Sequence, residues 1–226
     1  MKAVLALVLA SVALAAQSPS YGLQVGYGPS RSAGLDLASS SGTLAVDPAR
    51  QPGFTLRGLA AWTFSPDWSL EASLGWRARS SGSLAYRSSA AGSGTLDVQQ
   101  VLSSQVILGG LALRDLPVRT GTWSFGAGLD LRAERLSAET ARAASAASLT
   151  RPWLRATARF AWSGAWRPWV ALEFAAPVSK PATSAADYLQ DLDRLDTASN
   201  PSAGSVAKAH APTSEFLLAF GLRFPR

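Results

Sequence analysis

The feature that most constrains this chain is a hydrophobic alternation with a period of two, which recurs along most of its length. Between Trp68 and Trp76 every second residue is apolar, and the residues between them are polar or small. Successive side chains of a β-strand point to opposite faces, so such a run predicts a strand with one apolar face. Clear runs of this kind cover residues 21–27, 54–64, 68–76, 123–131, 154–162, 166–174 and 216–224. A further strand is expected within 97–113, where the apolar face can be assigned to either parity.

The connections between these strands alternate in length. Short connections lie near 65–67, 114–119 and 163–165. Long connections, rich in Ser, Ala, Gly and Pro, lie near 29–52, 78–95, 133–151 and 176–213. Short turns on one side and long loops on the other are typical of outer-membrane barrels. We therefore predict an all-β fold for residues 17–226, an eight-stranded antiparallel transmembrane up-and-down β-barrel. Because Pro168 cannot donate to a strand ladder, we expect it at a bulge or early in its strand.

Aromatic residues lie mainly at the two ends of the apolar faces. In several runs the two ends are eight residues apart, which is roughly 26 Å along a strand. With a tilt of about 40°, this length projects to roughly 20 Å, close to the apolar band of such barrels. We therefore predict aromatic girdles at both membrane interfaces, formed by Tyr21, Phe54, Trp62, Trp68, Trp76, Trp123, Trp162, Trp166, Phe174, Phe216 and Phe224. The alternative is a soluble sandwich or lipocalin-like barrel, but the small residues on the opposite faces suit a narrow lumen better.

The opposite faces also carry scattered charged residues, which we expect to meet inside the barrel. An eight-stranded barrel is only wide enough for its own side chains, and buried charges must be paired. This predicts Arg–carboxylate pairs that plug the lumen and involve Arg57, Glu71, Arg77, Asp130, Arg132, Arg155, Arg159, Glu173, Glu215 and Arg223. Arg167 is expected on the same face. Water, or acids elsewhere such as Asp97 and Glu134, would balance the excess of arginine. A narrow selective channel or a catalytic acid pair is the alternative interpretation.

The N-terminus indicates export. Lys2 precedes a 12-residue apolar run over residues 3–14, and Ala13 and Ala15 supply small residues at the two positions that a signal peptidase reads. This pattern predicts a cleaved signal peptide over residues 1–16, and the run is too short to span a membrane as a helix. The net charge of +6 would suit nucleic acid, but an exported chain does not meet the nucleic acid of the cell. The chain has no Cys and one His, so disulfides, thiolate sites and multi-histidine metal sites are excluded, and we expect no cofactor.

The signal peptide, the eight strands and the final strand FLLAFGLRF resemble the small eight-stranded bacterial outer-membrane β-barrels, the group of the OmpA transmembrane domain, OmpX and OmpW. The resemblance covers essentially the whole mature chain. In that family, a last strand that ends in an aromatic residue is recognised by the barrel insertion machinery. Here Phe224 is followed by Pro225 and Arg226, which departs from that pattern. The resemblance implies a monomer in the outer membrane of a Gram-negative cell envelope, in contact with its lipid and lipopolysaccharide.

The last long connection contains a helix signature. Ser184 and Asp187 have the spacing of a capping box, and Tyr188, Leu192 and Leu195 would share one side of the helix. We predict a short amphipathic helix over the barrel mouth, ending at the Asn200-Pro201 dipeptide. The Ala-rich stretch 137–148 is a second candidate for one or two helical turns.

His210, the only histidine, lies in the same connection near the predicted extracellular rim. Some lipid A-modifying enzymes are eight-stranded barrels that use a rim histidine with a serine and an acid, and Ser214 and Glu215 follow His210. Serine is abundant in every loop, so a solvated loop histidine is the plainer interpretation, and no catalytic residue is assigned. We expect a non-enzymatic barrel with a structural or surface-interaction role. The alternatives are a narrow OmpW-like conduit for small apolar molecules and a lipid A-modifying enzyme.

Overall fold

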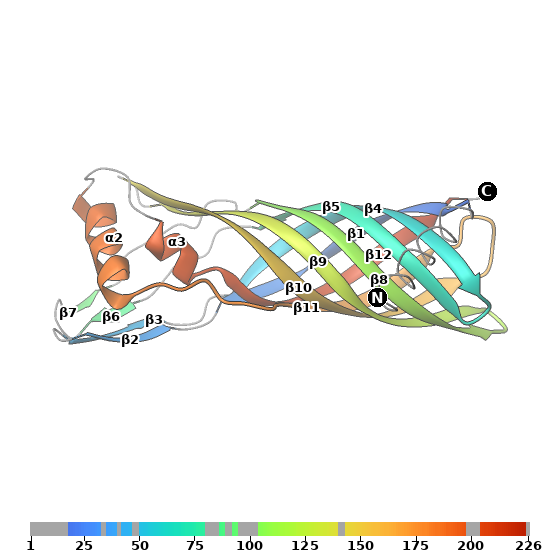
Figure 1. Ribbon diagram of the computed structural model, residues 1–226, viewed down its shortest axis with the longest axis horizontal. Helices are drawn as coiled ribbons and strands as arrows, with labels where there is room; N and C mark the ends of the chain where they lie inside the picture. The colour runs from blue at the N-terminus through green and yellow to red at the C-terminus, as the bar shows by residue number, and fades with distance from the viewer. Residues whose placement is uncertain are drawn as a thin grey trace, which may run out of the picture.

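The computed structural model describes residues 18–32, 35–39, 42–46, 50–79, 86–88, 92–94, 104–139, 143–197 and 204–224. Eight strands close into an antiparallel barrel in the order β1-β12-β11-β10-β9-β8-β5-β4, and β1 also pairs with β4. These strands are β1 (Ser20–Ser32), β4 (Arg50–Ser65), β5 (Trp68–Arg79), β8 (Ser104–Val118), β9 (Gly121–Glu139), β10 (Ala144–Trp162), β11 (Trp169–Pro177) and β12 (Pro212–Arg223). The predicted eight-stranded barrel is confirmed (Figure 1). The predicted signal peptide over 1–16 lies outside the described residues.

Exposure alternates with a period of two along the barrel strands. In β1, Tyr21 is 59% exposed, whereas Gln24 is fully buried. The apolar faces assigned from the sequence point outward, and the small and charged residues point inward. In β8, where the sequence allows either face to be the outward one, Val106 points outward and Ile107 points inward.

The short connections lie together at one end of the barrel, which we call the turn end. The connection between β10 and β11 is held on both sides by backbone hydrogen bonds. Ser163 N donates to Thr120 O at 3.2 Å, and Arg223 N donates to Trp166 O at 3.0 Å. Pro168 falls just before the first residue of β11, so it removes no hydrogen bond from the ladder. Its carbonyl oxygen accepts a bond from Trp162 N at 2.9 Å.

The opposite end of the molecule carries a cap outside the barrel (Figure 1). There β9 and β10 continue to pair up to Glu139 and Ala144, and the helices α2 (Ala185–Thr197) and α3 (Ser205–Ala209) pack against this hairpin. The buried apolar core of the cap consists of Leu136, Ala138, Ala147, Tyr188, Leu192, Leu195, Val206, Ala207 and Ala211. A small four-stranded sheet lies at the same end and is formed by β2 (Leu35–Ser39), β3 (Gly42–Val46), β6 (Tyr86–Ser88) and β7 (Gly92–Gly94).

Helix α2 confirms the helix predicted in the last long connection. Ser184 caps it as expected: Asp187 N donates to Ser184 Oγ at 3.1 Å, and that hydroxyl donates to Asp187 Oδ2 at 2.7 Å. Helix α2 ends at Thr197, and the predicted stop at Asn200-Pro201 lies outside the described residues. Among the described residues, no helix is long and apolar enough to cross a membrane.

The prediction of helical turns within 137–148 is wrong, because β9 runs to Glu139 and β10 starts at Ala144. Alanine has a high helix propensity, but propensity is a weak prior that tertiary packing overrides. The buried side chains of Ala138 and Ala147 are small, and α3 packs directly against this hairpin.

Candidate functional site: the charged lumen and its two ends

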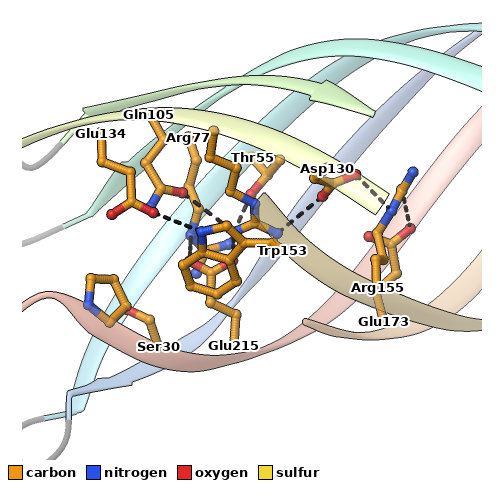
Figure 2. A network of polar contacts seen from close by, with 12 residues as sticks. Ser30, Thr55, Arg77, Gln105, Asp130, Glu134, Trp153, Arg155, Glu173 and Glu215 are labelled. Atoms are coloured by element: carbon orange, nitrogen blue, oxygen red, sulfur yellow. Dashed lines mark hydrogen bonds and ion pairs between the residues drawn. The ribbon is translucent and has the colours of Figure 1, made fainter. Parts of the chain in front are cut away.

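The barrel interior is filled by charged side chains from β4, β5, β9, β10, β11 and β12. Besides Glu134, nine of them are at most 2% exposed, and they are Arg57, Glu71, Arg77, Asp130, Arg132, Arg155, Arg159, Glu173 and Glu215. All nine were predicted as lumen residues, and every one makes an ion pair. Figure 2 shows part of this network and the strands that supply it.

Two carboxylates form the middle of the network, Asp130 from β9 and Glu173 from β11. Arg57 reaches both of them, with distances of 3.5 Å to Asp130 Oδ2 and 3.1 Å to Glu173 Oε2. Arg155 also reaches both, with distances of 3.2 Å to Asp130 Oδ1 and 3.6 Å to Glu173 Oε1. The two guanidinium groups therefore bridge the two carboxylates across the interior, which ties together strands that are not neighbours.

Glu215 from β12 forms the next layer toward the cap. It pairs with Arg77, whose Nε lies 3.3 Å from Glu215 Oε1, and with Arg132 through Nη1 and Oε2. Arg77 also donates to Thr55 Oγ1 at 2.8 Å. The guanidinium of Arg132 lies over the ring of Trp153, 4.1 Å from its centre. Each guanidinium is thus held in one orientation by several strands.

Trp153 closes the cap side of this layer, and its side chain is fully buried. Its indole nitrogen donates to Glu134 Oε1 at 2.9 Å. Arg151 binds the other oxygen of Glu134 through Nε at 3.1 Å and Nη2 at 2.5 Å. The structure therefore places Glu134, one of the acids suggested for charge balance, in a pair with Arg151. Asp97, the other suggested acid, lies outside the described residues.

The turn end of the lumen holds a separate ion pair. Arg159 donates to the two oxygens of Glu71 at 2.8 and 3.2 Å, and its guanidinium lies 4.0 Å from the centre of the Trp169 ring. Beyond this pair, the carboxylate of Asp115 accepts hydrogen bonds from Ser69 Oγ at 2.9 Å and Ser124 Oγ at 2.6 Å.

Arg223 and Arg167 do not join the ion pairs of the lumen. Within the described chain, no carboxylate oxygen lies within 4.0 Å of either guanidinium. Arg223 is half-buried at the end of β12, and Arg167 is exposed just before β11. Both line a cavity of about 270 Å³ at the turn end. Sequence periodicity assigns both residues to the inward parity, but it does not show that they lie beyond the last ion pair of the lumen.

The structure changes the interpretation of His210. The side chain is only 2% exposed, and its Nε2 lies 3.1 Å from the hydroxyl oxygen of Tyr188. The expectation of a solvated loop histidine is wrong because α2 packs onto α3 and covers the ring. Glu215 points instead into the lumen, where it binds Arg77 and Arg132. In the described part of the chain, no cluster of three or more His, Asp or Glu has the geometry of a metal site.

We expect the cap to loosen in acid because of His210. Burial lowers the pKa of His210 from 6.5 to about 4. The unfolded cap therefore binds a proton that the folded cap does not, so folded stability falls as the pH drops from 6.5 toward 4. The opening constant of the cap should rise by up to about tenfold per pH unit in this range. Hydrogen exchange of α2 and α3 amides, corrected for intrinsic rates, measures this. His210→Gln should abolish the dependence, and the same dependence in that variant would contradict the prediction.

The predicted girdle aromatics lie on the outside of the barrel. All except Trp62, which is half-buried, are between 42% and 59% exposed. Near the turn end, Trp123 contacts Phe160, an aromatic residue outside the predicted set, with ring centres 5.0 Å apart, and the rings of Trp166 and Phe224 are 6.1 Å apart. Between the two sets of aromatics, the outer surface exposes side chains such as Leu74 and Leu129.

Comparison with known proteins gives a match of fold. No protein-family model and no curated protein sequence matches the chain. Among solved structures, the chain is similar to the crystal structure of Neisserial surface protein A (NspA), with a TM-score of 0.50 and 11% sequence identity. The match covers 92% of this chain and 97% of that one. At this identity the likeness concerns the fold, and it shows that this chain shares the barrel architecture of NspA.

Proposed function

We propose that the chain is an integral outer-membrane β-barrel protein with a structural or surface-interaction role, whose lumen is plugged by Arg–carboxylate pairs. The observation that carries this proposal is that, in the reverse of a soluble barrel, the apolar side chains lie outside this barrel and the charged side chains lie inside it. Its exterior exposes large apolar side chains between two sets of aromatic residues, whereas its interior holds nearly all of the buried charge. A soluble barrel would have to solvate that apolar exterior, whereas a bilayer stabilises it.

The orientation follows from the length of the connections. Short turns face the periplasm in barrels of this kind, so the cap lies at the cell surface. A signal peptide over residues 1–16 would deliver the chain to the envelope. The outward aromatics Phe216, Phe220 and Phe224 on β12 are the features that we expect the barrel insertion machinery to recognise. The protein acts as a monomer in this proposal, because the barrel closes on itself without a partner strand.

Lipopolysaccharide is the proposed lipid partner at the cap end. Arg31 and Arg50 are exposed and lie directly opposite each other on β1 and β4. They stand four residues beyond the outward pair of Tyr27 and Phe54. Like charges at opposed positions destabilise a sheet, and a phosphate between them would relieve the repulsion. Arg151 is another arginine near the cap end, but it is buried against Glu134 and is therefore not proposed to bind lipopolysaccharide.

Two other functions have weaker support. An apolar conduit is favoured by the inward stripe of Ile107, Leu111 and Leu113 on β8, but the ion pairs fill the lumen beside it. A lipid A-modifying enzyme would need an accessible base beside its nucleophile, and His210 is buried against Tyr188. We therefore propose a non-enzymatic role.

Fractionation of cells that produce the full chain tests the proposal. The mature protein should be found in the outer membrane, and unboiled samples should migrate differently from boiled ones in gel electrophoresis. A compact barrel that resists detergent explains the difference in migration. Recovery in the soluble periplasmic fraction, with one migration regardless of boiling, would contradict the membrane assignment.

A further inference from the structure

The cavity at the turn end is lined by more positive than negative side chains, and the proposed structural role does not require this excess of positive charge. Its volume is about 270 Å³, and its charged lining residues are Arg159, Arg167, Arg223 and Asp115. Trp169 and Arg159 form its inner wall, where the ion pair between Arg159 and Glu71 separates the cavity from the rest of the lumen.

Two of the three guanidinium groups in this cavity make no ion pair with a carboxylate of the described residues. Arg159 is engaged by both oxygens of Glu71. The nearest available acid, Asp115, accepts hydrogen bonds from two serine hydroxyls instead of from an arginine. Arg167 and Arg223 therefore face the same small space without a carboxylate within 4.0 Å in the described chain. Adjacent positive charges without counter-ions favour the binding of an anion.

The backbone around Arg167 indicates that this arrangement is imposed by the fold. Arg167 has a φ of 35°, which is costly for a residue with a side chain. The segment 163–168 is nevertheless fixed, because Thr120 on one side and Arg223 on the other form backbone hydrogen bonds with it. Such strain persists only where the surroundings enforce it, and it is concentrated at ligand clamps.

We infer that this cavity binds a phosphate group, held between the guanidinium groups of Arg167 and Arg223. A phosphate has enough oxygens and negative charge to accept bonds from two guanidinium groups, which match its geometry well. The cavity is smaller than the usual range for drug-sized ligands, so it fits a single small anionic group. That group belongs either to a free phosphate or small phosphomonoester, or to the headgroup of a phospholipid beside the turn end.

Titration of the refolded full-length barrel in octyl glucoside tests this inference, because that detergent carries no phosphate. Inorganic phosphate is added near pH 7.5, where a phosphate group is mostly doubly charged. Binding is followed by calorimetry and by tryptophan fluorescence, since Trp162 and Trp169 line the cavity. Dihexanoyl phosphatidic acid is titrated in a second series. Binding at least about tenfold tighter than that of inorganic phosphate identifies a lipid headgroup as the source, and similar binding identifies a soluble phosphate.

Three variants make the test specific. Arg223→Gln and Arg167→Gln should each raise the dissociation constant at least about tenfold, because each removes a charge-assisted contact. Arg119→Gln removes an exposed arginine from a neighbouring turn that does not line the cavity, and should change the constant by less than about twofold. Altered migration on boiling shows that each variant has folded. The inference is wrong if neither phosphate probe saturates the unmodified protein below about 10 mM, or if Arg119→Gln weakens binding as much as Arg223→Gln.

Discussion

Replacing Asp130 by asparagine is expected to lower the free energy of unfolding by about 3–5 kcal/mol, because three buried guanidinium groups each lose one of the two carboxylates that they contact. Asp130 lies within 3.5 Å of nitrogen atoms of Arg57, Arg132 and Arg155. Asparagine has nearly the same shape as aspartate, so the loss of charge dominates the effect. Reversible urea unfolding of the barrel in lipid vesicles measures the change.

Two further variants show whether the loss arises from the charge network. Asp67→Asn changes an exposed turn aspartate and should alter stability by less than about 0.5 kcal/mol. Combining Asp130→Asn with Arg155→Met removes one of the cations that are in excess once Asp130 is neutralised, so the double variant should be more stable than Asp130→Asn alone. A cost of under about 1 kcal/mol for Asp130→Asn would mean that the ion pairs do not determine stability.

Ala72→Lys is expected to destabilise the barrel by roughly 2–4 kcal/mol, because it places an ammonium group in the middle of the bilayer. Ala72 is exposed on β5, midway between Trp68 and Trp76, and pairs with Ala60 and Gly110 on the neighbouring strands. A lysine there can neither retain its water nor find a carboxylate. The same urea titration in vesicles gives the difference in free energy.

Ala72→Leu is the matched control, since it adds a larger apolar side chain without a charge at the same position. It should be close to neutral in a bilayer. If Ala72→Lys costs no more than Ala72→Leu, this face meets water, and the assignment of the apolar exterior to lipid must be abandoned. A lysine at the neighbouring Ser73 is a poor comparison, because Ser73 is buried beside Arg155 and Asp130.

The barrel was predictable from sequence because its alternation is strict. Inward and outward residues of β5 differ so clearly in polarity that the phase cannot be confused. In β8 the inward side chains include Ile107, Leu111 and Leu113, which match the apolar outward face. Only pairing with β5 and β9 determines which face is inside. When a strand is apolar on both faces, its own sequence does not indicate which face points inward.

The cap was only partly predictable, because long-range packing determines it. Helix α2 has a local signal in Ser184 and Asp187, so it was found. The burial of His210 depends on Tyr188, 22 residues away, and no local pattern reports that contact. In the same way, the inward parity of Arg223 follows from alternation, whereas its lack of a carboxylate partner depends on where the neighbouring strands end.

The paired extension of β9 and β10 determines how far the cap helices stand from the barrel. The ladder is unbroken from the pair of Trp162 and Gly121 at the turn end to the pair of Ala144 and Glu139 beneath the helices. The eight residues from Leu131 to Glu139 rise roughly 26 Å along the strand, or about 20 Å along the barrel axis after tilt. A continuous two-stranded ladder, rather than a single extended chain, thus holds the helices at this distance beyond Leu131. In the proposed membrane orientation, this ladder fixes the height and the orientation of the helices relative to the bilayer.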